Sequence, residues 1–128
     1  MVQRVAKLLQ YFMIKDLVFT MSDSSHIPDK RTYAFHQKAA EILCAAPNRI
    51  NEVNEILLHW RSLVGTQAEG WAEKWQELTI GLSVIEIAEL ICKEGEEMDF
   101  YRKSSPFACL LSSEQRMEIL RKFKYDHD

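Results

Sequence analysis

Carboxylate side chains gather in one third of this sequence. Residues 66–99 contain nine Asp and Glu but only two Lys and Arg, a local charge of −7 (2 − 9) in a chain of net charge −3. At such a density carboxylates could hold a divalent cation, or could form an acidic surface that attracts a basic partner. The candidate residues for either role are Glu86, Glu89, Glu94, Glu96, Glu97 and Asp99.

Four of these acids form two spaced motifs. Glu86 and Glu89 make E-x-x-E, and after six intervening residues Glu96 and Asp99 make E-x-x-D. The pattern resembles in part the all-α MazG-like nucleotide pyrophosphohydrolases, whose carboxylates hold Mg²⁺ on a triphosphate. The resemblance implies a metal-dependent nucleotide hydrolase, although Ile85 stands where that family has a further acid. A solvated acidic stripe explains the same residues without any ligand, because charge runs commonly face water.

Other catalytic and metal-binding patterns are missing from the sequence. It has no Gly-rich phosphate loop, no G-x-S-x-G and no H-E-x-x-H. We therefore predict no catalytic residues, no metal and no cofactor. A Cys–His pair could still meet in space, since such pairs need not be close in sequence. The histidines show no zinc-type spacing with one another or with the cysteines: His26, His36, His59 and His127.

Cysteine usage and hydropathy bear on the compartment. Cys44, Cys92 and Cys109 are odd in number and widely separated, which predicts free thiols and a reducing environment. No run of 18 apolar residues could span a membrane. Lys15 and Asp16 interrupt the apolar N-terminal stretch, and no small-residue cleavage site follows it. We expect a cytoplasmic protein with no membrane partner.

Basic residues near the C-terminus raise the possibility of nucleic-acid binding. Glu114 and Glu118 alternate with them, and the whole chain is acidic, with a pI near 5.8. Attraction to phosphates is the main source of nonspecific DNA affinity, so this charge balance argues against a nucleic-acid partner. The basic residues are Arg116, Arg121, Lys122 and Lys124.

Apolar periodicity predicts the fold. A chain of 128 residues with 47% hydrophobic residues has the size of one domain, which we expect to span residues 1–128. Apolar residues recur every three or four positions and no alternating pattern appears, which predicts an all-α bundle of five or six helices. Two adjoining apolar rows run from Leu78 to Cys92, so we expect a buried central helix at about residues 67–94, with Leu82 and Ile85 in the core.

Helix boundaries follow from caps and turn residues. We expect helices over residues 2–19, from Pro28 to before Pro47, from Asn48 to Gly65, and from Ser112 onward. Thr66 and Ser112 should act as N-caps, each with Glu or Gln three residues later. Residues 96–105 fit either a short helix or a surface turn. The tryptophans should be mostly core, although one of them could anchor a partner: Trp60, Trp71 and Trp75.

The leading functional hypothesis combines the helical scaffold with the clustered acids. It is a small acidic cytoplasmic protein-binding module, an immunity protein or antitoxin that binds and neutralises a toxin of the nuclease type. Its partner would carry a basic surface, and the six acids named above would bind that surface. The alternatives are a MazG-like pyrophosphohydrolase and a helical DNA-binding regulator.

Overall fold

The structure is a computed structural model that describes residues 27–127, with side chains from 29 to 123. This part of the chain contains helices and no strand, so the predicted all-α class is confirmed. The helix predicted over residues 2–19, His26, and the side chains of Lys124 and His127 lie outside the described residues. The elements are α2 (Ile27–Ala45), η2 (Pro47–Arg49), α3 (Ile50–Ser62), α4 (Gln67–Thr79), α5 (Val84–Ile91), α6 (Glu96–Arg102), η3 (Phe107–Leu110) and α7 (Ser113–His127), where η marks a 3-10 helix.

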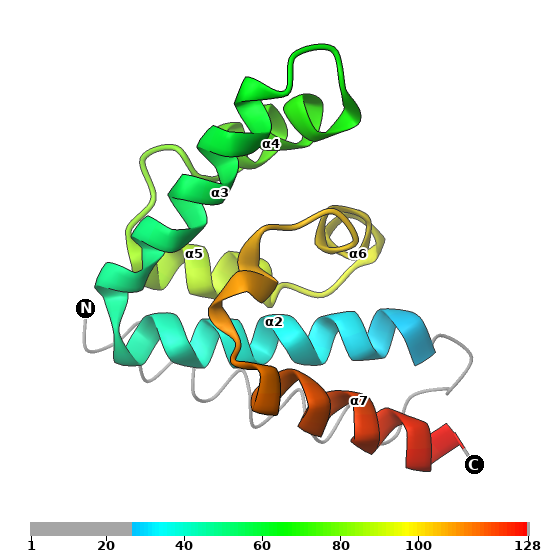
Figure 1. Cartoon of the computed structure of the whole chain (residues 1–128). Helices are drawn as coiled ribbons and strands as arrows, with labels where there is room; N and C mark the ends of the chain where they lie inside the picture. The colour runs from blue at the N-terminus through cyan, green and yellow to red at the C-terminus, as the bar shows by residue number, and fades with distance from the viewer. Residues whose placement is uncertain (1–26, 128) are drawn as a thin grey trace.

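Helix α2 occupies the centre of the described fold. It crosses the middle of the molecule in Figure 1, with α7 along one side and α5 and α6 on the other. It packs most extensively on α5, and it also contacts α6, α7 and both 3-10 helices. Ala39, Ala40 and Leu43 of α2 are completely buried. The small alanine side chains let the neighbouring helices approach this helix closely.

The prediction of a single central helix at residues 67–94 is wrong. The segment forms two helices, α4 and α5, joined by a turn at residues 80–83. Gly81 adopts a φ of +77°, which a residue with a Cβ rarely tolerates, so the helix cannot continue through it. Ser83 then starts α5 with a capping box: the Glu86 N–H donates to Ser83 Oγ (3.2 Å), and the Ser83 N–H donates to Glu86 Oε1 (2.9 Å).

The buried face of α5 also differs from the prediction. Ile87, Ala88 and Ile91 are buried against the core, whereas Leu82 and Ile85 are only half-buried. The break at Gly81 gives α5 an axis of its own, so the apolar rows counted through residues 78–92 do not share one face. Truncation to alanine is therefore expected to lower the free energy of unfolding most at Ile87 and Ile91, rather than at Leu82 and Ile85.

Helices α3 and α4 form a hairpin that rises from the rest of the fold (Figure 1). Their connection contains Gly65, and Thr66 is the N-cap of α4, as predicted. The Glu69 N–H lies 3.5 Å from Thr66 Oγ1, while the Glu69 carboxylate accepts the N–H of Gly65 (3.0 Å). Asn48 is not the cap of α3, because Pro47–Arg49 forms a 3-10 turn and α3 begins at Ile50.

The last third of the chain closes over the core. The undecided segment at residues 96–105 contains α6, and Ser112 caps α7 with Gln115 as predicted. Aromatic rings join α4 to α6 and η3: Trp75 is completely buried, 5.3 Å from the Phe107 ring centroid. None of the helices within residues 27–127 combines the length and the hydropathy that crossing a bilayer requires.

Candidate functional site

The six candidate acids lie at three different places in the fold. Glu86 caps the start of α5, and Glu89 lies one turn further along that helix. Glu94 follows in the connection from α5 to α6, and Glu96 and Glu97 form the first turn of α6; these three are exposed. Asp99 is half-buried on α6. The structure therefore gathers only Glu94, Glu96 and Glu97 into one exposed group, which we call the acidic connection.

The carboxylates of the E-x-x-E motif have local roles. Glu86 accepts the N–H of Ser83, as described above. Glu89 faces α2, where burial raises the pKa of the Cys44 thiol and the carboxylates of Glu89 and Glu41 raise it further. In the described part of the chain, no group of three or more His, Cys, Asp or Glu residues is placed to hold a metal ion. Asp99 of the second motif is engaged with an arginine.

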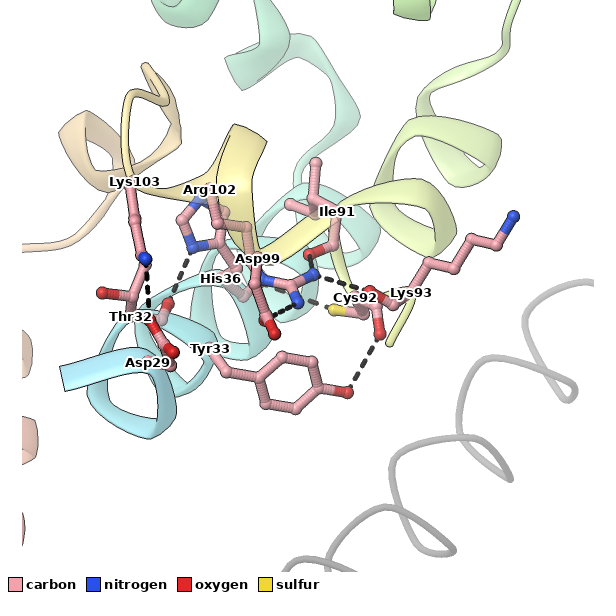
Figure 2. Close-up of polar contacts among 10 residues, drawn as sticks. All are labelled: Asp29, Thr32, Tyr33, His36, Ile91, Cys92, Lys93, Asp99, Arg102 and Lys103. Atoms are coloured by element: carbon pink, nitrogen blue, oxygen red, sulfur yellow. Dashed lines mark hydrogen bonds and ion pairs between the residues drawn. The ribbon is translucent and has the colours of Figure 1, made fainter. Parts of the chain in front are cut away.

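That arginine, Arg102, is the main polar residue beneath the acidic connection. It is only 3% exposed, and its Nη1 donates to the carbonyls of Ile91 (3.1 Å) and Lys93 (2.7 Å) at the end of α5. Its Nη2 donates to Asp99 Oδ1 (2.5 Å), and Figure 2 shows these bonds together. The guanidinium also lies over the Tyr33 ring of α2, 4.9 Å from its centroid. A cation suits the carbonyl end of a helix, so Arg102 fixes α6 to α5 and α2.

Neighbouring contacts also fix the ends of these helices. The Tyr33 hydroxyl donates to the carbonyl of Cys92 (2.9 Å), and Lys103 pairs with Asp29 at the start of α2 (3.4 Å; Figure 2). The Trp75 indole N–H donates to the carbonyl of Ser104 (2.9 Å). The acidic connection is therefore held at both ends by long-range contacts rather than being a free loop.

An exposed aromatic ring lies beside the acidic connection. Phe100 of α6 is 55% exposed, and its ring packs against Trp71 of α4 with 5.2 Å between centroids. Phe100 follows Glu96 and Glu97 by four and three residues, so the three side chains lie on the same side of α6. Lys74 Nζ sits 4.7 Å from the centroid of the Trp71 ring. We name the set Trp71, Glu96, Glu97 and Phe100 the acid–aromatic surface.

The acids of this surface were predicted from the sequence, whereas Phe100 was not. The E-E-x-x-F spacing at residues 96–100 places these side chains on one side of the chain only if the segment is helical. The sequence of residues 96–105 fits a surface turn as well as a short helix, so the spacing alone did not predict the surface. Of the three tryptophans, Trp75 is completely buried, whereas Trp60 and Trp71 are half-buried. Trp71 is thus the tryptophan that borders the exposed acids.

A second polar group joins α2 to the segment before η3. The carbonyl of Thr32 lies 2.7 Å from His36 Nδ1, which fixes the proton on that nitrogen. Nε2 then accepts the hydroxyl proton of Ser105 (2.6 Å), and Ser105 Oγ accepts the N–H of Phe107 (3.1 Å). The imidazole is 3% exposed. Cys92 Sγ approaches the backbone carbonyl of His36 (3.7 Å) rather than its ring. These bonds give the histidine a structural role.

Burial lowers the pKa of His36 from 6.5 to about 4, opposed by its bond to Thr32 and assisted by the nearby Arg102 charge. Between pH 4 and pH 6.5 the unfolded chain binds a proton at His36 that the folded protein does not. The contribution of His36 to the free energy of unfolding is therefore fully present above pH 6.5 and is lost as the pH drops toward 4. Over this pH range the shift in the pKa of His36 changes the free energy of unfolding by about 3 kcal/mol.

The measurement is urea unfolding between pH 7 and pH 4. We expect His36→Gln to be less stable than wild type at pH 7 and to lose less stability on acidification. His59→Gln, which changes an exposed residue of α3, should follow the wild-type pH profile. Parallel profiles for wild type and His36→Gln would contradict this assignment.

A further prediction concerns divalent cations. We expect the melting temperature to be the same with and without Mg²⁺, for wild type and for the Glu86→Gln/Glu89→Gln variant alike. Glutamine keeps an oxygen that can accept the Ser83 N–H, so the capping box survives the change. A ligand bound only by the folded state raises its stability, so a Mg²⁺-dependent stabilisation that disappears in the variant would favour the hydrolase alternative.

The basic residues of α7 were the basis of the nucleic-acid alternative. Arg116 donates to the carbonyl of Ala108 in η3 (2.8 Å), which ties α7 to the preceding turn. Glu114 and Glu118 are exposed on the same helix, as are Arg121 and Lys122. The exposed face of α7 therefore has mixed charge.

Comparison with protein-family models, with curated proteins and with solved structures gave no match to this chain.

Proposed function

We propose that this protein is a small protein-binding module of the immunity-protein or antitoxin kind, which neutralises a basic protein of the nuclease type by covering its surface. The observation that supports this proposal is the acidic connection, in which Glu94, Glu96 and Glu97 are exposed within four residues. A nuclease binds phosphates with Lys and Arg, and a carboxylate cluster complements such a surface.

The way the acidic connection is held also supports binding. Arg102 bonds the end of α5, and Trp75 bonds the carbonyl of Ser104 just after α6. A surface that is ordered before association loses less conformational entropy when it binds. Glu96 and Glu97 lie in the first turn of α6, where negative charges favour the helix dipole, so the fold presents them to a partner without being destabilised by them.

The cysteines support a cytoplasmic location as part of the same proposal. Cys44, Cys92 and Cys109 are all free thiols. Burial raises the pKa of each of them, so all three stay protonated near neutral pH. Protonated, partly or fully buried thiols are unreactive residues suited to a reducing compartment.

The test is the triple variant Glu94→Gln/Glu96→Gln/Glu97→Gln. A partner is isolated with wild-type protein from the native host and identified, and its association rate is measured at several salt concentrations. We expect the variant to associate roughly tenfold or more slowly at low salt and to lose most of the salt dependence, because steering charges act on the on-rate. The purified partner's nuclease activity should be inhibited by wild type and less by the variant.

The matched control is Glu114→Gln/Glu118→Gln, which removes two exposed acids from α7. It should associate at nearly the wild-type rate. Asp99 is left unchanged in both variants, because its carboxylate pairs with Arg102 and its loss would disturb the fold. Equal association rates for wild type and the triple variant would place the binding site elsewhere.

A further inference from the structure

The open face of α6 carries an aromatic side chain that the core does not use. Phe100 is 55% exposed, and it lies outside the hydrophobic cluster that contains Trp75, Phe107 and Met98. Its ring is nevertheless held in place by Trp71 (5.2 Å) and lies 6.1 Å from the ring of Tyr101. An ordered, solvent-facing aromatic ring has the properties of a binding anchor, because large rings concentrate binding energy at interfaces.

The charges around the ring determine what could cover it. Glu96 and Glu97 are exposed one helical turn before Phe100 and on the same side of α6. An aromatic face next to two carboxylates suits a guanidinium, because that planar cation stacks on a ring while its N–H groups bond to carboxylate oxygens. A lysine ammonium would gain the charge attraction but not the stacking.

The chain itself shows that this aromatic pair accepts a cation. Lys74 Nζ lies 4.7 Å from the Trp71 centroid, so one ring of the pair already carries a positive charge from α4. Phe100 is the more exposed ring and has the two carboxylates beside it. The place left for an external cation is therefore on Phe100.

We propose that the acid–aromatic surface is a docking site for an arginine side chain on a basic segment of a partner protein. The guanidinium stacks on Phe100 and pairs with Glu96 and Glu97. This proposal rests on the proposed function, since it names the chemistry by which the acidic connection recognises its partner. The same carboxylates repel phosphate groups, which excludes nucleic acid as the occupant of this surface.

The probes are two fluorescent peptides of equal charge, deca-arginine and deca-lysine, titrated against the whole protein and followed by anisotropy at low and moderate salt. Wild type should bind the arginine peptide at least about threefold more tightly, the size of one exposed cation–π contact. Phe100→Leu should lose most of the preference for the arginine peptide, while keeping the affinity of wild type for the lysine peptide; bonding of the guanidinium to Glu96 and Glu97 accounts for the preference that remains. Glu96→Gln/Glu97→Gln should weaken binding of both peptides.

The outcomes separate the two proposals. Acid-dependent binding with equal affinity of wild type for the two peptides overturns the arginine site alone. So does a preference for arginine that is as large in Phe100→Leu as in wild type. If the affinity for both peptides is unchanged in Glu96→Gln/Glu97→Gln, the acidic connection does not bind basic segments. That result counts against the arginine site and against the proposed function as well. A concentration-dependent dimer of wild type that dissociates in Phe100→Leu would make a second copy the occupant and would overturn the arginine site.

Discussion

Replacing Trp75 with alanine is expected to lower the free energy of unfolding by about 3–5 kcal/mol, the usual cost of truncating a buried large aromatic residue. Trp75 is completely buried between α4 and the last third of the chain, with the ring centroids of Tyr101 and Phe107 at 5.9 and 5.3 Å. Its loss leaves a cavity and removes the donor to the carbonyl of Ser104. Urea unfolding at pH 7 measures the change.

Two further variants separate packing from hydrogen bonding at this position. Trp75→Phe keeps most of the aromatic contact but removes the indole N–H, so we expect a smaller loss of about 1–3 kcal/mol. Phe100→Ala removes an exposed ring from α6 and should cost much less than Trp75→Ala. Similar unfolding midpoints for Trp75→Ala and Phe100→Ala would show that the rings between α4 and α6 are not part of the stabilising core.

Replacing Arg102 with alanine is expected to lower the free energy of unfolding by about 3–5 kcal/mol, because two carbonyl acceptors lose a charged donor at about 1–3 kcal/mol each. The change removes three hydrogen bonds, leaves the carbonyls of Ile91 and Lys93 without this donor, and exposes the ring of Tyr33 to a void. The measurement is again urea unfolding, with helical circular dichroism to check the fold. Lys103→Ala, at a neighbouring residue that is 59% exposed, should be nearly neutral.

Arg102→Met tests whether the charge and hydrogen bonds of the guanidinium stabilise the fold beyond the space that the side chain fills. Methionine fills part of the space without a donor, so we expect an intermediate loss of stability if the bonds to the end of α5 carry most of the effect. A methionine variant as stable as wild type would mean that the guanidinium is replaceable by apolar packing, as is known for some buried ion pairs. An alanine variant within about 0.5 kcal/mol of wild type would show that Arg102 does not hold α6 in place.

Local sequence patterns predicted much of the fold. The caps at Thr66 and Ser112 and the turn after α3 were readable because the residues that form them are neighbours in the chain. The same kind of signal was present at Ser83–Glu86, an S-x-x-E just after Gly81, yet the apolar periodicity across residues 78–92 favoured one continuous helix. A glycine at positive φ outweighs apolar spacing, because strain at one residue is enough to end a helix.

The candidate site was predictable only in part. The exposed acids followed from composition, since adjacent carboxylates seldom bury together. The residues that hold them did not: Tyr33 reaches Cys92 across 59 positions, and His36 reaches Ser105 across 69. Such contacts depend on how α2 packs on α5 and η3, which no local pattern encodes. Asp99 shows the consequence, because composition grouped it with the exposed acids while its carboxylate in fact pairs with a buried cation.

The central position of α2 has a consequence for how the chain folds. Its last residue, Ala45, is separated by 38 residues (46–83) from the start of α5, the helix it packs on most extensively. During synthesis at ~5–20 residues per second, the apolar side of α2 therefore waits roughly 2–8 s for that partner and longer for α7. The α3–α4 hairpin closes a short loop and can form first. Docking of α5 and α7 onto α2 is then the late step, and until it occurs the side of α2 that these helices cover is exposed to aggregation and to chaperones.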